Sequence, residues 1–389
     1  MNVKTVKKPK PRVETDYLGR LNIQAYGYDN LYPQHLNSIT GSSGTASLCL
    51  ERYSKFVGGG GFQDKALAAF ILNNANETAA DILQNVAADV ARFGGYALHV
   101  NYNVLGQIVE VRHVPFENCR LEETDERGNV NHICVHPDWT GNKTRNGRRL
   151  NVSEENIDRI NVFNPNPAVV VSQMEAAGGV MLYKGQILWR STAGKFTYPI
   201  PIYDAAITDI STDEGLANIK CRNARNNFMI ACMLVTKKGL PKVDENGVEH
   251  DEEMISADDL QDFQGDENCG KIMKVTLEND EDEPKVVPFP TSNWDREFVQ
   301  TENSVISRIY AQFHQELFYS IRIGKLGFSG QVMQDAYGQY AGEVTTEQRF
   351  IERGFAAILS AFVDGSIQGA NVTIEPLKYV SLDNNTITE

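Results

Sequence analysis

The sequence predicts an α+β protein in which helices are followed by strands and then by further helices. Three observations support this prediction. Apolar residues recur every three or four positions up to residue 93 and alternate from Tyr96 onward. Two long helical segments then bracket a short, charged, strand-like segment. The chain of 389 residues is 41% hydrophobic and 23% charged, which is enough for several domains with a sizeable core.

The N-terminal part combines a basic arm with helices. Residues 1–25 are predicted to form an extended arm, because five cations precede the first acidic residue, Glu14; they are Lys4, Lys7, Lys8, Lys10 and Arg12. Residues 42–45 predict the start of a helix that ends at the four glycines of residues 58–61. Further helices are predicted over residues 66–72 and 78–93.

Strand-like alternation defines the next region. The segments 96–102, 107–114, 119–122 and 130–136 are separated by turn residues and predict a meander of antiparallel strands. Two more segments, 157–163 and 180–190, are predicted to lie on or beside the same sheet. Together with the preceding helices, these strands form an α+β domain over residues 26–198.

Two long helices are predicted around a small insertion in the second half. The segment 199–235 holds a helix from Ile202 to Val235, and 293–321 holds the second. Between them, residues 236–292 contain a predicted hairpin of strands 270–277 and 284–289. Residues 331–389 are predicted to form C-terminal helices and a tail, with a capping box at Thr345 to Gln348 opening the last helix.

The charge of the chain is concentrated in that insertion. Between Asp244 and Glu283 there are 16 acidic residues and two lysines, so this segment accounts for the whole formal net charge of −14. An acidic balance disfavours a nucleic-acid binder of the basic-patch kind. The segment is therefore either a solvated insertion or a surface that repels like charge.

The sequence carries no motif that predicts catalysis or a cofactor. His132, Cys134 and His136 alternate on a predicted strand and would share one face, which is compatible with a metal site but more typical of ordinary strand side chains. The glycines at 58–61 lack the Lys-Ser/Thr of a phosphate-binding loop. The six cysteines form no CxxC pair, and no segment is apolar enough to cross a membrane. We therefore expect a non-enzymatic, soluble protein of a reducing compartment.

One glycine-rich loop is the best candidate for function. Residues 324–330 hold three glycines, one lysine and one phenylalanine, directly after Arg322. This composition is typical of a mobile loop that contacts phosphate, although a simple connection between helices has the same composition.

In its order of elements, the chain resembles the portal proteins of tailed bacteriophages. The similar sequence segments are YGYDNLYPQ at 26–34, the predicted helix that ends in GGGGF, residues 93–121, YPIPIY at 198–203 and residues 307–359. The resemblance covers residues 20–365 approximately. The sequence that follows Phe362 is short for the crown domain of that family.

This resemblance implies a homo-oligomeric ring of twelve subunits at one capsid vertex, through which double-stranded DNA is packaged and ejected. Residues 26–198 would be the wing, 199–235 and 293–321 the stem helices, 236–292 the clip and 331–389 wing and crown. The loop 322–330 would line the DNA channel with Arg322, Gly324, Lys325, Leu326, Gly327, Phe328, Ser329 and Gly330.

The resemblance also implies partners and a location. The acidic clip or lumen would be formed by Asp266, Glu267, Glu278, Asp280, Glu281, Asp282 and Glu283. An acidic lumen would let DNA slide, because phosphate contacts with Lys and Arg bind tightly. The expected partners are the terminase, the major capsid protein and a head-tail adaptor, with no membrane and no cofactor. The ring would be assembled in the host bacterial cytoplasm and belong to the virion.

Two alternatives stay open. The chain could be another ring or adaptor protein of the virion, or an enzyme that acts on nucleic acid. An enzyme would need convergent acidic residues for a metal, whereas those of the insertion are predicted on a solvated tip. A large closed ring under native conditions would favour the portal, and a monomer or dimer with nuclease activity that depends on divalent metal would favour the enzyme.

Overall fold

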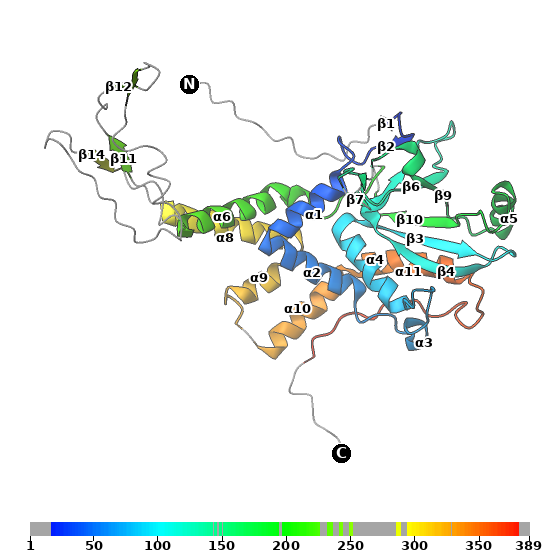
Figure 1. Ribbon diagram of the computed structural model, residues 1–389. Helices are drawn as coiled ribbons and strands as arrows, with labels where there is room; N and C mark the ends of the chain where they lie inside the picture. The colour runs from blue at the N-terminus through cyan, green and yellow to red at the C-terminus, as the bar shows by residue number, and fades with distance from the viewer. Residues whose placement is uncertain are drawn as a thin grey trace. The chain divides into compact units, whose positions relative to one another are not determined.

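The computed structural model describes residues 17–142, 144–145, 148–149, 151–193, 197–225, 232–235, 241–243, 249–251, 285–288, 294–327 and 329–380 (Figure 1). The chain divides into two compact units. The first comprises Met1–Ser211 and Ile306–Glu389, and the second comprises Thr212–Val305. The first unit mixes helices with a six-stranded sheet, as predicted for an α+β protein.

Short strands and helices form the beginning of the first unit: β1 (Tyr17–Leu18), β2 (Ile23–Gln24), α1 (Tyr32–Ser42), α2 (Gly44–Gly58), α3 (Lys65–Ala68) and α4 (Ala79–Phe93). The predicted start of α2 is confirmed, because the Ser43 side chain accepts a hydrogen bond from the Ala46 amide. Thr78 and Asp81 form a capping box at the start of α4. The helix predicted over residues 66–72 is shorter and ends at Ala68.

The sheet is mixed and is not a meander. Its strands are β3 (Gly95–Tyr102), β4 (Ile108–Val114), β5 (Cys119–Leu121), β6 (His132–Val135), β9 (Asp158–Val162) and β10 (Gln186–Ser191). Their order is β4-β3-β10-β9-β6-β5, so β4 and β5 lie at opposite edges. The later strands β9 and β10 insert between β3 and β6 and run parallel to each other. A two-stranded sheet is formed by β7 (Thr144–Arg145) and β8 (Arg148–Arg149).

The parallel pair exists because a helix connects it. This helix, α5 (Pro167–Ala176), was not predicted; it carries the chain from β9 back to the start of β10. Its signals were present: Asn166 caps the helix through the Ala168 amide, Pro167 occupies the first turn, and Gly178 and Gly179 follow its end. The predicted strand over residues 180–190 therefore begins only at Gln186.

Two helices pack on one face of the sheet (Figure 1). From α4, Asp89 contacts His113, which pairs across the sheet with Leu98. From α11 (Thr345–Leu359), Gly354 lies against Tyr96 and Leu188 of the same face. The helix α11 is amphipathic; its buried apolar residues are Ile351, Phe355, Ile358 and Leu359, followed by Phe362.

Both edges of the sheet are covered. Beside β4, the Ile108 amide donates to the Ala361 carbonyl and the Val363 amide donates to the Ile108 carbonyl, at 2.9 and 2.7 Å. Beside β5, Ile23 forms a bridge with Glu122. Covered edges are protected from pairing with strands of another chain.

The first long helix ends earlier than predicted. After the 3-10 turn Asp204–Ala206, α6 runs from Ile207 to Arg225, whereas the prediction extended it to Val235. Residues Cys232–Val235 form strand β11, which pairs with β14 (Lys285–Pro288). The β-branched residues of β14 provide a strand partner that the local helical pattern does not reveal. The predicted partner of β14, residues 270–277, lies outside the described residues.

The second long helix is divided. Instead of one helix over 293–321, the chain forms α8 (Trp294–Gln312) and α9 (Glu316–Arg322). It continues with α10 (Gly330–Glu343) and α11. The predicted capping box of α11 is absent, because the Thr345 hydroxyl donates back to the Ala341 and Gly342 carbonyls of α10. Beyond α11, an isolated bridge joins Ile374 to Phe62.

Candidate functional site

The predicted channel loop connects α9 with α10. Arg322 is the last residue of α9 and Gly330 the first of α10, so the connection is shorter than the predicted segment 322–330. Ser329 caps α10 by accepting a hydrogen bond from the Val332 amide. Gly324 and Gly327 have φ angles of 76° and 68°, and no atom lies within 4 Å of a Cβ added at either position. Phe328 lies outside the described residues.

The two cationic side chains of this loop, Arg322 and Lys325, differ in how tightly they are held. The Arg322 guanidinium donates to the Tyr310 hydroxyl at 3.0 Å, and this hydrogen bond raises the pKa of Arg322. Its charge lies 5.9 Å from the centre of the Tyr310 ring. The Lys325 side chain is exposed, and only its backbone amide is fixed, on the Ser320 carbonyl. Lys325 is therefore the less restrained of the two cations.

A break between α8 and α9 fixes the base of the loop. His314 adopts a left-handed φ of 57°, which ends α8. The next residue, Gln315, is fully buried; it donates to the Cys49 carbonyl and the Tyr340 hydroxyl and accepts from Arg52. These partners come from α2 and α10 and hold the chain in place at the break. The loop thus has a rigid base and an open tip.

The predicted acidic site lies entirely outside the described residues. This holds for all seven named acids, Asp266, Glu267, Glu278, Asp280, Glu281, Asp282 and Glu283. Within the acidic segment the structure describes only β13 (Glu249–Asp251), which pairs with β12 (Pro241–Val243). This hairpin was not predicted from the sequence.

Tyrosine side chains join the two sequence segments, 26–34 and 198–203, that carry part of the family resemblance. The ring of Tyr26 stacks on that of Tyr198 with centroids 4.1 Å apart, and its hydroxyl donates to the Pro199 carbonyl. Tyr198 donates to the Gln24 carbonyl, and Tyr203 donates to the Arg92 carbonyl. These hydrogen bonds fix the chain immediately before α6. This contact cannot be predicted from local sequence, because the two segments lie far apart in the chain.

A fully buried cation completes this junction. Arg120 donates to the side chain and carbonyl of Asn30 at 2.6 Å each, and to the carbonyls of Glu117 and Cys119. Its guanidinium lies 4.9 Å from the centre of the Trp139 ring. Burial lowers the pKa of Arg120 to about 10, so it stays charged at neutral pH. Its partners give it a structural role.

The candidate metal residues are each engaged separately. His132 contacts the Glu122 carboxylate at 2.6 Å, and the Cys134 thiol accepts from Arg159 at 3.4 Å. The buried His136 accepts from the Asp138 amide, and burial lowers its pKa. Among the described residues, no three His, Cys, Asp or Glu side chains are placed to hold a metal ion. In the same part of the chain, no helix has the length and hydropathy of a membrane span.

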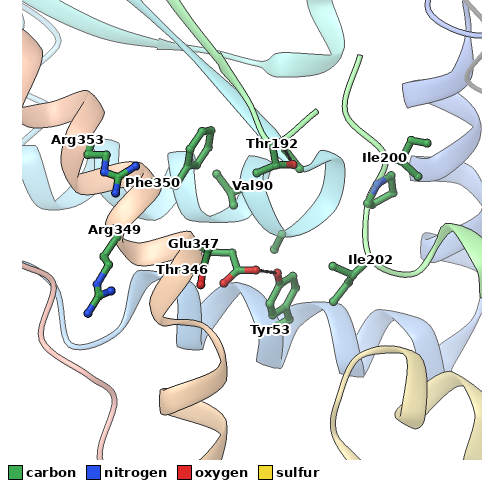
Figure 2. Close-up of a pocket in the computed structure, with 13 residues that line it drawn as sticks. Tyr53, Val90, Thr192, Ile200, Ile202, Thr346, Glu347, Arg349, Phe350 and Arg353 are labelled. Carbon is green, nitrogen blue, oxygen red and sulfur yellow. Dashed lines mark hydrogen bonds between the residues drawn. The ribbon is translucent and has the colours of Figure 1, made fainter. Parts of the chain in front are cut away.

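A further cavity, of about 480 Å³, lies beside the first half of α11 (Figure 2). We call it the α11 pocket. Its apolar wall is formed by Val90, Ala91, Ile200, Pro201, Ile202 and Phe350, and its polar wall by Tyr53, Thr192, Thr346, Glu347, Arg349 and Arg353. No local pattern predicts this pocket, because its residues come from segments that are far apart in the sequence.

Ion pairs join α6 to α8 within each unit. In the first unit, Arg308 lies 3.5 Å from Asp209, and in the second, Lys220 pairs with Glu302. The earlier residue of α6 pairs with the later residue of α8, as in two antiparallel helices. In the second unit, Ile219 and Val299 of these helices are exposed.

Comparison with known proteins finds solved structures that share the fold of this chain. No known protein family matches the sequence, and no curated protein does. A chain in the neck of an empty gene transfer agent particle, computed with C6 symmetry, is 14% identical; the match covers 92% of this chain and 86% of that one, with a TM-score of 0.51. A chain in the neck of the native particle, computed with C12 symmetry, is 13% identical. The match covers 94% of this chain and 86% of that one, with a TM-score of 0.50. The protein has the fold of these neck chains.

A third structure is more distant. The chain in the crystal structure of a HK97 family phage portal protein from Corynebacterium diphtheriae is 11% identical. The match covers 72% of this chain and 76% of that one. Its TM-score of 0.34 is below the level at which a shared fold is inferred.

Proposed function

We propose that the protein is the portal of a phage-like particle, a closed homo-oligomeric ring at one capsid vertex through which double-stranded DNA enters and leaves. The observation that carries this proposal is the fold match over more than nine tenths of the chain to chains of a particle neck. One of those necks was computed with C12 symmetry, which is the symmetry of a ring of twelve.

The charge distribution is suited to this role. In a ring, the acidic segment between Asp244 and Glu283 would be repeated around one opening and repel the duplex from its wall. The exposed Lys325 on an open loop would provide one weak, salt-sensitive phosphate contact per subunit. Acidic residues that repel the duplex, together with a few cations that contact its phosphates weakly, would let DNA slide through the ring.

The surface of the described part of the chain is compatible with a ring. Both edges of the sheet are covered, so copies would not associate through strands. The exposed aliphatic residues of α6 and α8, Ile219 and Val299, would instead pack between neighbouring helices. The proposed partners are the terminase and the head-tail adaptor at the acidic insertion and the major capsid protein around the ring, and the place of action is the virion.

Electron microscopy and native mass measurement test the proposal. The purified full chain is expected to give closed rings with a central hole and a mass of about twelve chains. A monomer, a dimer or an open filament at every salt concentration would overturn it. Rings of another size would retain the channel and revise the subunit number.

A second candidate is an adaptor ring of the same neck, because the matching chains are described only as parts of necks. Particles assembled without the protein distinguish the two roles. Loss of the portal would leave capsids without packaged DNA, whereas loss of an adaptor would leave capsids that package DNA and then release it.

A further inference from the structure

The chain that follows α11 crosses from one edge of the sheet to the side of α10 (Figure 1). It leaves the β4 edge at Val363 and forms the isolated bridge between Ile374 and Phe62. It then brings the ring of Tyr379 to 5.5 Å from the ring of Tyr337 in α10. The segment therefore reaches the helix that follows the predicted channel loop.

The first part of this segment is held tightly. Backbone hydrogen bonds of 2.7 to 2.9 Å join Thr373 and Glu375 to residues 60–63, directly after α2. Between them, the side chain of Ile374 is buried, with 2% of its surface exposed. A Cβ at Gly59 would lie 2.2 Å from the Glu375 carbonyl oxygen. The glycines that end α2 thus leave the space in which this segment lies.

The second part of the segment is held loosely. Residues 376–380 make no backbone hydrogen bond within the described part of the chain. Their ring contact with another element is that of Tyr379 on Tyr337. Tyr337 in turn packs on Phe56 of α2 and Phe318 of α9, with ring centroids 5.0 and 5.8 Å apart. Tyr379 is therefore an outer member of an aromatic cluster that holds three helices together.

The helix α10 depends on few contacts of this kind. Its buried residues are Ala336, Tyr340 and Ala341, all in its second half. The first half, which directly follows the loop, has no buried residue. Helical segments with few buried contacts open locally at a low cost in free energy. A single ring contact at Tyr337 can therefore change how often this part of α10 opens.

We propose that residues 371–380 form a strap, anchored at residues 373–375 and closed by Tyr379, that restrains α10 and the loop before it. Release of Tyr379 would leave the anchor in place, because one aromatic pair contributes less than a buried side chain with several hydrogen bonds. In the proposed ring, the strap would limit how far Lys325 reaches toward phosphate. Only in this respect does the inference rest on the proposed function.

Hydrogen exchange of the full chain, followed by mass spectrometry, tests the strap. Tyr379→Ala is expected to speed exchange of the amides of residues 330–337 about fivefold and to leave those of α4 unchanged. Tyr379→Phe keeps the ring and should exchange like the unaltered protein. Val380→Ala is the matched control, because Val380 is 80% exposed. Unchanged exchange in Tyr379→Ala, or equal acceleration in α4, would overturn the proposal.

A second variant tests whether the anchor and the ring act as one unit. Ile374→Ala weakens the anchor and is expected to speed exchange in α10 at least as much as Tyr379→Ala does. Adding Tyr379→Ala to this variant should then produce no further acceleration, because both substitutions detach the same strap. Additive accelerations would mean that the two contacts are independent and would overturn the strap.

The outcomes separate this inference from the proposed ring, because exchange is measured on the protein without DNA. Closed rings in which Tyr379→Ala leaves the exchange of α10 unchanged would overturn the strap and leave the ring in place. The expected acceleration in a chain that forms no closed ring would support the strap and overturn the ring.

Discussion

Glycine occurs both where α11 packs on the sheet and in the loop between α9 and α10, but its surroundings differ. A Cβ at Gly354 would lie 1.8 Å from the Tyr96 hydroxyl oxygen, so only glycine fits between the helix and the sheet. At Gly324 and Gly327 a Cβ would meet nothing within 4 Å, and only the positive φ favours glycine. Packing therefore fixes the first region, whereas backbone freedom defines the second.

The largest effect is expected from Gly354→Ala. The new methyl group must displace Tyr96 or the helix, and overpacking of this kind costs about 3 kcal/mol of unfolding free energy. Adding Tyr96→Phe should recover part of the loss, because the Tyr96 hydroxyl is buried without a hydrogen-bond partner. Thermal unfolding of the two variants and of Tyr96→Phe alone measures this. Unchanged stability of Gly354→Ala would mean that the helix and sheet are not tightly packed.

The next largest effect is expected at the base of the loop. Gln315→Ala removes three hydrogen bonds and leaves buried groups of α2 and α10 without partners, which costs about 2 kcal/mol. The control is Gln339→Ala on the exposed side of α10. Unfolding in urea should separate the two. Equal midpoints would show that Gln315 does not anchor the break between α8 and α9.

A smaller effect is expected in the loop itself. Gly327→Ala should cost about 1 kcal/mol because alanine disfavours a φ of 68°, and Gly327→Asn should cost less because asparagine tolerates this conformation. Gly330→Ala is the matched control, since Gly330 is helical and has equally open surroundings. If alanine and asparagine at position 327 cost the same, the left-handed conformation is not what glycine provides there.

The smallest effect on stability is expected from Lys325→Ala, within about 0.5 kcal/mol, because the side chain is exposed. Its effect on DNA should be larger, since the substitution removes a phosphate contact from every subunit of the proposed ring. Rings should form normally and retain less DNA, whereas Lys325→Arg should retain the full length. Full-length retention by the alanine variant would assign the loop to a purely structural connection.

Much of the candidate site could not be predicted from sequence, and the reason differs from residue to residue. The loop between α9 and α10 was found from its glycines, which act locally. The role of Arg120 was missed because its partner Asn30 is 90 residues away. The α11 pocket was missed because an empty space between packed segments has no signature in any one of them.

The sequence by itself determined the elements whose ends are set by neighbouring residues. Ser43 starts α2, the pair Thr78 and Asp81 starts α4, and Gly94 ends α4 in a left-handed conformation. Caps of this kind act within about four residues, so they can be recognised without any knowledge of the fold. The alternation from Tyr96 likewise located β3 and β4, because the period of two is a local property of a strand.

Only the tertiary structure decided which elements meet. The order of the strands, the pairing of β11 with β14 and the division of the second long helix at His314 all depend on partners far away in the sequence. A segment such as Cys232–Val235 is compatible with helix or strand, and the strand is chosen because β14 supplies the backbone hydrogen bonds. Long-range pairing overrides local preference wherever it satisfies more backbone groups or buries more apolar surface than the local alternative.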